Sequence, residues 1–308
     1  MYQKSIEEAK KRLFRGELVI FPTETVYGIG GNANNRKSIE LIYKTKNRPI
    51  NNPLICHFAN MEEIEKNFIL KDKDYELANT FWPGPLTLIL EKKINSMISP
   101  LLSNNKNQVG CRIPNNKISL SLLSIIDFPI AAPSANIATR TSVTSIEDLD
   151  YKLKEIFYID GGSSVLGLES TVIKTTKNGC KILRLGSLTI EDIKLKFPKY
   201  EISIDQSDVS PGNQLKHYSP IKPIRINVNF VKKNETLLNF GINELTSDIK
   251  SLNLSIDENL SDASYNFYNY LNILDNISCN GIAVAPIPDQ GLGKTINDRL
   301  RRASYKDE

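Results

Sequence analysis

Three cations stand close together near the N-terminus, shortly after a stretch that is rich in glycine. Lys44, Lys46 and Arg48 follow the segment TVYGIGG at residues 25–31, and an apolar run at residues 18–21 comes before it. Glycine lets a backbone turn sharply or approach a ligand closely, and lysine and arginine bind phosphate and carboxylate groups. These residue types predict an anion-binding site. Cations at a helix end can also merely complement the helix dipole, so composition alone leaves both interpretations open.

A second candidate is Arg112, which stands in an apolar segment, QVGCRIP, at residues 108–114. An unpaired charge is costly to bury, so this side chain needs a carboxylate partner from the protein or from a ligand. Because Ser134 and Asn136 offer groups that suit phosphate or ribose, we favour a ligand as that partner. A simple turn would use the same serine and asparagine.

His57, one of two histidines, lies in another apolar run at residues 53–58. It is a candidate ligand-binding residue, and the alternative is a histidine satisfied within the core. Four widely separated cysteines, three of them in apolar runs, are typical of reduced core residues in a cytoplasmic protein. No metal-binding cluster, signal peptide or membrane span is expected. The net charge of +4 is too small to predict binding to nucleic acid.

The elements that must position these residues alternate between helices and strands. Helices are expected at residues 5–14, 38–48, 61–67, 72–81, 118–126, 145–156 and 189–197, and strands at 18–21, 53–58, 86–90, 108–114, 129–133, 158–162 and 180–185. Lys177-Asn178-Gly179 predicts a hairpin turn, so the sheet is not all parallel. We therefore predict a mixed, twisted α/β sheet flanked by helices.

The chain length of 308 residues favours two domains. We place the first at residues 1–197, a proline-rich linker or lid at 198–223, and a small α/β Rossmann-like domain at 224–308. Gly293-Lys294-Thr295 is not part of a P-loop, because proline stands at position 288 where the motif needs glycine. Arg299, Arg301 and Arg302 are interpreted as a solvated basic helix end that could contact tRNA.

Seven words of the sequence resemble those of one family. They are PTETVYG at 22–28, KTKNRPINNPLICH at 44–57, FWPGPLTLIL at 81–90, PIAAPSAN at 129–136, LEST at 168–171, SPGNQLKHYSP at 210–220 and GLGKTINDRLRRAS at 291–304. Together they are similar to the long form of the threonylcarbamoyl-AMP synthases, which joins a YrdC-type domain to a C-terminal domain. The expected fold is therefore YrdC-like in the first domain.

The resemblance implies that L-threonine, bicarbonate and ATP react to give L-threonylcarbamoyl-AMP and pyrophosphate. Mg²⁺ is expected to accompany ATP, and no tightly bound cofactor is expected. The product would pass to a separate threonylcarbamoyl-transferase that modifies tRNA next to the anticodon, in the cytoplasm and with no membrane partner. Direct binding of tRNA is a further expectation.

The resemblance also assigns residues to the two substrates. The threonine side takes Thr25, His57, Arg112, Ala132 and Ser170. The nucleotide side takes Arg48, Asn52, Gln108, Ser134, Asn136, Ser142, Arg184 and Leu215. The catalytic set is Lys46, Arg48, Ser134 and Asn136, the K-x-R and S-x-N pairs of the family.

Two alternatives from other classes stay open. One is a non-catalytic protein that binds double-stranded RNA or tRNA, since YrdC-type domains are associated with such RNA. The complete K-x-R and S-x-N set argues against it. The other is a carbamoyltransferase of the hydrogenase-maturation type, which we rank low because no zinc-finger or acylphosphatase module accompanies the domain.

Overall fold

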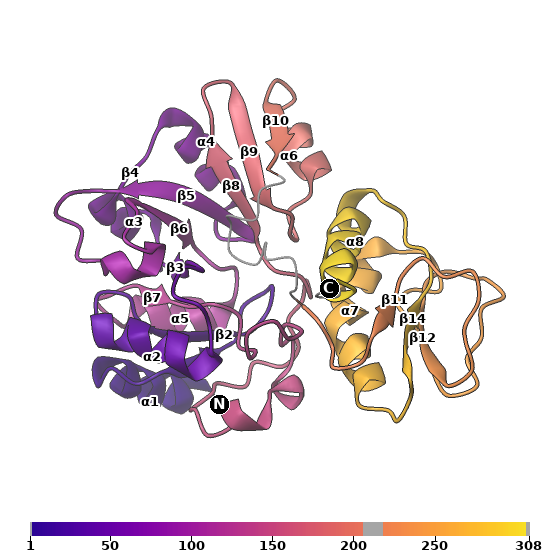
Figure 1. The fold of residues 1–308 in the computed structure, drawn as a ribbon. Coiled ribbons are helices and arrows are strands. Elements are labelled where there is room, and N and C mark those ends of the chain that lie inside the picture. Colours follow the sequence, from indigo (N-terminus) through magenta and orange to yellow (C-terminus); the bar gives the residue numbers. More distant parts are fainter. Residues whose placement is uncertain (1, 206–217, 306–308) are drawn as a thin grey trace.

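The computed structural model describes residues 2–205 and 218–305, which form a larger and a smaller α/β unit (Figure 1). The larger unit, here called the catalytic domain, contains α1 (Tyr2–Phe14), β1 (Val19–Phe21), β2 (Gly28–Asn32), α2 (Arg36–Lys46), β3 (Ile55–His57), α3 (Met61–Asn67), β4 (Phe68–Ile69), α4 (Asp72–Phe81), β5 (Leu86–Lys92), β6 (Gln108–Arg112), α5 (Lys117–Ser124), β7 (Ile130–Ala131), β8 (Thr171–Thr175), β9 (Gly179–Arg184), α6 (Ile190–Lys196) and β10 (Glu201–Ile204).

These strands form one sheet in the order β1-β2-β7-β3-β6-β5-β8-β9-β10, with β4 paired to β5. Parallel and antiparallel pairs both occur, and the hairpin at residues 177–179 joins the antiparallel β8 and β9. The prediction of a mixed α/β sheet flanked by helices is therefore confirmed.

Sheet topology brings distant residues to one edge. The parallel strands β3 and β6 end at His57 and Arg112, which are partners across the ladder. Because β5 is antiparallel to β6 and β8 is parallel to β5, β8 begins at this same edge, directly after Ser170. β9 then runs antiparallel to β8 and ends there at Arg184. Segments more than a hundred residues apart thus meet through strand order alone.

Some local expectations need correction. The helix expected from residue 38 begins earlier, at Arg36, and its N-cap is Asn35, whose side chain accepts a hydrogen bond from the Lys37 amide. Ser38 is buried and donates to the Gly16 carbonyl. Two short 3₁₀ turns, Ile146–Asp148 and Tyr151–Leu153, stand where a helix over 145–156 was expected.

β10 continues the large sheet beyond the boundary predicted at residue 197, since it pairs in parallel with β9. It lies within the segment interpreted as a linker, where its side chains are mostly exposed. Its four residues alternate between polar and apolar, but so short a run beside a proline-rich segment was interpreted as part of the linker.

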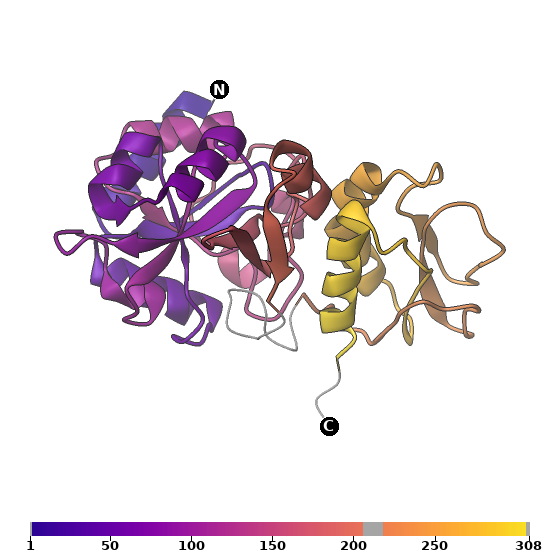
Figure 2. The same cartoon turned by 90° about the horizontal axis from the view of Figure 1, so that it is seen from above.

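The smaller unit, here called the C-terminal domain, contains β11 (Ile224–Arg225), β12 (Glu235–Asn239), β13 (Ser251–Asn253), α7 (Leu260–Asp275), β14 (Gly281–Val284) and α8 (Gly291–Ala303). Its sheet is parallel, in the order β11-β14-β12-β13. Helices α7 and α8 lie between this sheet and the catalytic domain (Figure 2). That this domain is Rossmann-like stays a prediction.

Cys56, Cys111 and Cys180 are buried free thiols, as expected of core residues. None of the helices in residues 2–205 and 218–305 has the length and apolarity needed to cross a membrane.

Gly30 is a packing residue of the core. A Cβ atom there would lie 2.4 Å from Ile130 Cγ2 and 2.8 Å from the Phe21 ring, and both neighbours are fully buried. The close approach that glycine allows at this position is therefore between strands, whereas Gly28 lies at the pocket described below.

Gly30→Ala is expected to lower the free energy of unfolding by about 1–3 kcal/mol, because overpacking forces the neighbouring side chains to shift. Urea denaturation followed by circular dichroism measures the change. A free energy of unfolding equal to that of the wild type would contradict the proposed packing role of Gly30.

Candidate active site

One pocket gathers most of the residues predicted to bind substrates. It lies over β3, because Pro53, Ile55 and His57 alternate along the strand and point to the same face. Its walls are Thr23, Thr25, Val26, Tyr27, Gly28, Arg48, Arg112, Ala132, Pro133, Ser134, Glu169, Ser170, Arg184 and Tyr218. The predicted residues that line it are Thr25, Arg48, His57, Arg112, Ala132, Ser134, Ser170 and Arg184.

Arg48 reaches the pocket because the chain reverses directly after α2. Asn47 ends the helix in the left-handed conformation, with φ of 51°, and places Arg48 beside Pro53. The guanidinium donates to the Asn52 and Pro53 carbonyls and to the Asn52 side chain. Burial lowers the pKa of Arg48 to about 10, which leaves it charged at neutral pH. Asn52 thus orients Arg48 and does not itself line the pocket.

Lys46 takes a different position from the one expected for a phosphate ligand. Its side chain is buried, and its Nζ donates to the carbonyls of Ser134 and Asn136. Burial, and secondarily the nearby Arg48, lowers its pKa well below the usual lysine value. In this structure Lys46 is a brace that joins α2 to the S-x-N turn. The K-x-R and S-x-N pairs are therefore in direct contact, as their pairing in the family signature suggests.

The S-x-N turn is held by its own side chains. The Ser134 hydroxyl donates to the Asn136 side-chain oxygen, and the Asn136 amide donates to the carbonyls of Ile137 and Arg140. Ser134 lines the pocket, whereas Asn136 is buried behind it. Asn136 is thus placed to orient Ser134.

Arg112 has a partner from the protein, which corrects the expectation of a ligand carboxylate. The buried Glu24 carboxylate lies 2.6 Å from Arg112 Nη2, and Arg112 Nη1 donates to the Thr25 hydroxyl at 2.9 Å. Glu24 and Thr25 follow β1 in the PTET turn. The pair explains how an arginine is tolerated inside an apolar segment, and Arg112 still lines the pocket.

His57 is neutral at physiological pH. Burial, and secondarily the charge of Arg112, lowers its pKa to about 3. Its ring contacts Phe21 edge to face at 5.9 Å, so it is packed in the core and also lines the pocket. The two interpretations of this histidine are therefore compatible.

Ser170 and Arg184 form another part of the pocket wall. Arg184 donates to both the carbonyl and the hydroxyl of Ser170, and the Ser170 hydroxyl also bonds to Thr87. Burial lowers the pKa of Arg184. The predicted threonine side and nucleotide side thus touch at this contact.

Besides Lys46, Asn52 and Asn136, two of the predicted residues that the structure describes do not line the pocket. Gln108 begins β6 on the surface, where it accepts a hydrogen bond from Lys174. Ser142 is buried behind the pocket and donates to Glu169. Leu215 lies outside the described residues.

Three residues that contribute to the site were not predicted from the sequence. They are Glu24, Glu169 and Tyr218. A signal was present: both glutamates stand next to assigned residues, Thr25 and Ser170, in segments that are otherwise apolar or small. Tyr218 belongs to the linker word SPGNQLKHYSP.

Known proteins share this architecture. The family model described as "Telomere recombination" matches residues 11–186, and the model described as "Threonylcarbamoyl-AMP synthase, C-terminal domain" matches residues 188–304. The chain is 33% identical to the threonylcarbamoyl-AMP synthase of Pyrococcus abyssi, over 98% of this chain and 96% of that protein. It is 33% identical to the threonylcarbamoyl-AMP synthase of Bacillus subtilis, over 97% of this chain and 92% of that protein.

The crystal structure of P. abyssi Sua5 complexed with L-threonine matches the present structure with a TM-score of 0.85 and 31% identity. The match covers 97% of this chain and 94% of that chain. Family models, sequence relatives and this solved structure all extend through both domains. The chain therefore belongs to the threonylcarbamoyl-AMP synthase family, in the form that carries the additional C-terminal domain.

Proposed function

We propose that this chain catalyses the reaction of L-threonine, bicarbonate and ATP to L-threonylcarbamoyl-AMP and pyrophosphate. The observation that carries the proposal is the pocket over β3, in a chain that matches the family over nearly its full length. Three arginines, Arg48, Arg112 and Arg184, line this one pocket. A P. abyssi relative has been solved with L-threonine, which supports the same substrate here.

The chemistry needs no protein nucleophile. The threonine amine adds to bicarbonate with loss of water, and one carbamate oxygen then attacks the α-phosphorus of ATP. The bond from that phosphorus to the bridging oxygen breaks, and pyrophosphate leaves. Because the nucleophile is already an anion, the protein has to gather negative charges, align them and stabilise the charge that develops. Three arginines that line one pocket suit this task, since the guanidinium binds carboxylate and phosphate through paired hydrogen bonds.

We assign Thr25, His57 and Arg112, together with Ala132 and Ser170, to the binding of threonine. Neutral His57 and the hydroxyl groups can exchange hydrogen bonds with the amino-acid side chain and amine. We assign Arg48 and Ser134 to the binding of the nucleotide. Lys46, Asn52 and Asn136 hold those two residues in place. Arg184, which donates to Ser170, is also assigned to the nucleotide.

Mg²⁺ fits this site as a partner of ATP. In the described residues no group of three histidine, cysteine, aspartate or glutamate side chains is arranged to hold a metal ion. The two carboxylates nearest the pocket, Glu24 and Glu169, are engaged by Arg112 and Arg299. Magnesium usually retains several waters and binds substrate phosphates, so it would arrive on the nucleotide and assist the departure of pyrophosphate.

We further propose that the product passes to a transferase acting on tRNA in the cytoplasm. A direct tRNA contact at the end of α8 would involve Arg301 and Arg302. Arg299 is excluded from it, because this side chain is fully buried and was wrongly interpreted as solvated.

The first test is pyrophosphate release from ATP and Mg²⁺ by the purified chain, with threonine and bicarbonate supplied separately and together. Release is expected only when both are present, because the attacking carbamate forms from both. Release with neither, or with an unrelated amino acid, would indicate another adenylating enzyme. No release from folded protein would favour the non-catalytic RNA-binding alternative.

Arg48→Ala is expected to reduce pyrophosphate release at least about 100-fold, the scale for removal of one preorganised donor to transition-state charge. The fold should persist, since the hydrogen bonds that the structure gives the Arg48 side chain go to Asn52 and Pro53 of its own turn. The matched control is Arg36→Ala at the start of α2, where the arginine is exposed and pairs with Glu40. Equal activities for the two variants would refute the role of Arg48.

Lys46→Met is expected to impair both stability and catalysis, because it leaves two buried carbonyls without their donor. The free energy of unfolding should fall by about 1–3 kcal/mol, and KM for ATP should rise. Ser134→Ala, by comparison, should reduce activity with little change in stability. Urea denaturation and initial rates at varied ATP measure the two effects. A Lys46→Met variant with wild-type stability would show that the brace is dispensable.

A further inference from the structure

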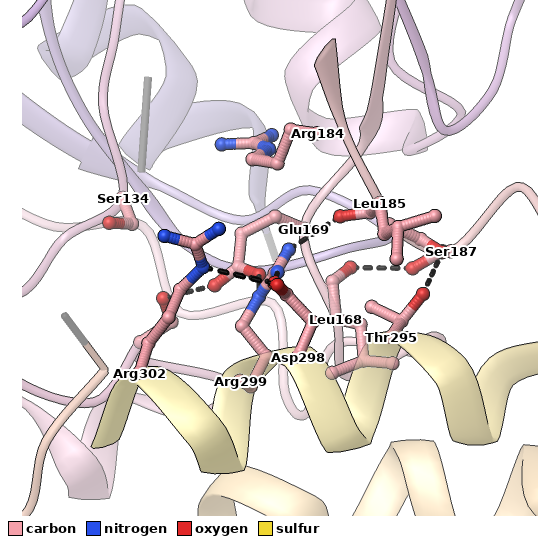
Figure 3. Close-up of polar contacts among 12 residues, drawn as sticks. Ser134, Leu168, Glu169, Arg184, Leu185, Ser187, Thr295, Asp298, Arg299 and Arg302 are labelled. Atoms are coloured by element: carbon pink, nitrogen blue, oxygen red, sulfur yellow. Dashed lines mark hydrogen bonds and ion pairs between the residues drawn. The ribbon is translucent and has the colours of Figure 1, made fainter. Parts of the chain in front are cut away.

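Helix α8 of the C-terminal domain reaches the pocket through a side chain that does not itself line it. Arg299 is 0% exposed. Its Nε donates to Glu169 Oε2 at 2.9 Å, and its Nη2 donates to the Leu185 carbonyl at 2.6 Å (Figure 3). Its guanidinium carbon also lies 4.5 Å from the centre of the Tyr218 ring. Arg299 thus contacts two pocket walls, Glu169 and Tyr218, which come from separate segments of the chain.

The Glu169 carboxylate is held from both domains. Its Oε1 accepts hydrogen bonds from Ser142 of the catalytic domain and from the Tyr268 hydroxyl of α7, the latter at 2.8 Å. Burial alone would raise the pKa of Glu169, but Arg299, Arg184 and these hydrogen bonds bring it down to about 2. Glu169 is therefore ionised at neutral pH, and its charge depends on a partner from the other domain.

A shift of Glu169 would be transmitted to the substrate pocket. The next residue is Ser170, whose carbonyl and hydroxyl accept hydrogen bonds from Arg184. Ser170 and Arg184 both line the pocket. The backbone at 169–170 therefore couples the interdomain contact to the wall where threonine and nucleotide would meet.

Helix α8 is itself fixed against the catalytic domain. Thr295 donates to the Gly186 carbonyl at 3.0 Å, and Ser264 of α7 donates to the Leu166 carbonyl at 3.0 Å. Val26 and Leu168 of the catalytic domain belong to the same buried apolar cluster as the core of the C-terminal domain. Arg299 consequently extends from a rigid base.

We infer that Arg299 is a positioning residue for adenylation: anchored on α8, it sets the placement of Glu169 and Tyr218, and through Glu169 that of Ser170. This gives the C-terminal domain a part in the chemistry of the pocket. The inference rests on the proposed function, because its readout is the adenylation reaction.

The test compares wild type, Arg299→Met, Glu169→Gln and the double variant E169Q/R299M. Pyrophosphate release is measured at varied threonine between pH 6 and pH 9, with thermal unfolding to confirm that each full-length variant is folded. R299M is expected to lose about 10- to 100-fold in kcat/KM for threonine. This is the scale of loss when a group that positions the substrate is displaced by up to about an ångström. The double variant should recover most of this loss, because it removes the unpaired charge together with its partner.

The loss in R299M should be larger at high pH than at low pH. Without Arg299, burial raises the pKa of Glu169, so that Glu169 becomes protonated as the pH falls. The neutral acid tolerates burial better than the carboxylate does, and the loss of activity is therefore smaller at low pH. The groups that face or surround Glu169 are Arg299 and Asp298 of α8, Tyr268 of α7, Arg184 of β9, Ser142 and Tyr218. E169Q/R299M has no carboxylate at this position and should not show the added pH dependence.

Arg225→Met is the matched control, since Arg225 forms an arginine–glutamate pair with Glu235 in the sheet of the same domain. It should stay within about twofold of wild type, because neither residue of this partly buried pair lines the pocket. If R299M does not fold, Arg299→Lys replaces it: the cation is kept but the planar contacts to Leu185 and Tyr218 are lost, and a loss of about threefold or more is expected.

Absence of threonine-dependent release by the wild-type chain would overturn the proposed function and this inference with it. With an active wild type, the inference alone fails if folded R299M stays within about twofold of wild type at every pH, or if folded R299K does so where R299M cannot be made. It also fails if the loss in R299M is restored neither by E169Q nor by lower pH.

Discussion

Charge cannot be buried without a partner, and this constraint shapes the whole pocket. Lys46, Arg112, Glu169 and Arg299 are each at least 95% removed from solvent. Each is satisfied by a group from another segment: the S-x-N carbonyls, Glu24 in the PTET turn, and the reciprocal pair of Glu169 and Arg299. Every such pairing fixes the distance between two pocket walls. The site is consequently preorganised for anionic substrates before any of them binds.

The arrangement separates residues that face the substrates from residues that hold them in place. Arg48, Ser134 and Ser170 line the pocket, whereas Asn52, Asn136 and Ser142 lie behind it and bond to a lining side chain. A family signature therefore mixes two kinds of residue. Lys46 illustrates the difference, because its type suggests a phosphate ligand while its position makes it a brace between a helix and a turn.

The second domain is connected to the first by more than apolar packing. Tyr268 and Arg299 of the C-terminal domain hydrogen-bond to Glu169, alongside Ser142 of the catalytic domain. The buried ion pair contributes little net stability when compared with an apolar contact of the same size, since desolvation offsets the attraction. What it supplies here is a defined relation between α8 and the wall of the pocket.

By itself the sequence determined the strand-to-helix alternation, the hairpin at 177–179 and eight of the residues that line the pocket, because periodicity, turn chemistry and short words are local properties. Helices 61–67 and 72–81 were predicted with their observed bounds. A helix was expected over residues 145–156, where two 3₁₀ turns stand, and β10 was assigned to the linker, because elements this short leave too brief a pattern to identify them.

Only the tertiary structure decided which charges meet. Arg112 pairs with Glu24, and Arg299 with Glu169, which is 130 residues away in the chain. Such pairings depend on strand order and on how two domains pack, and neither is encoded in the spacing of a motif. The same arginine that a helix-end pattern placed in solvent is buried, because the face of α8 that carries it is covered by another domain.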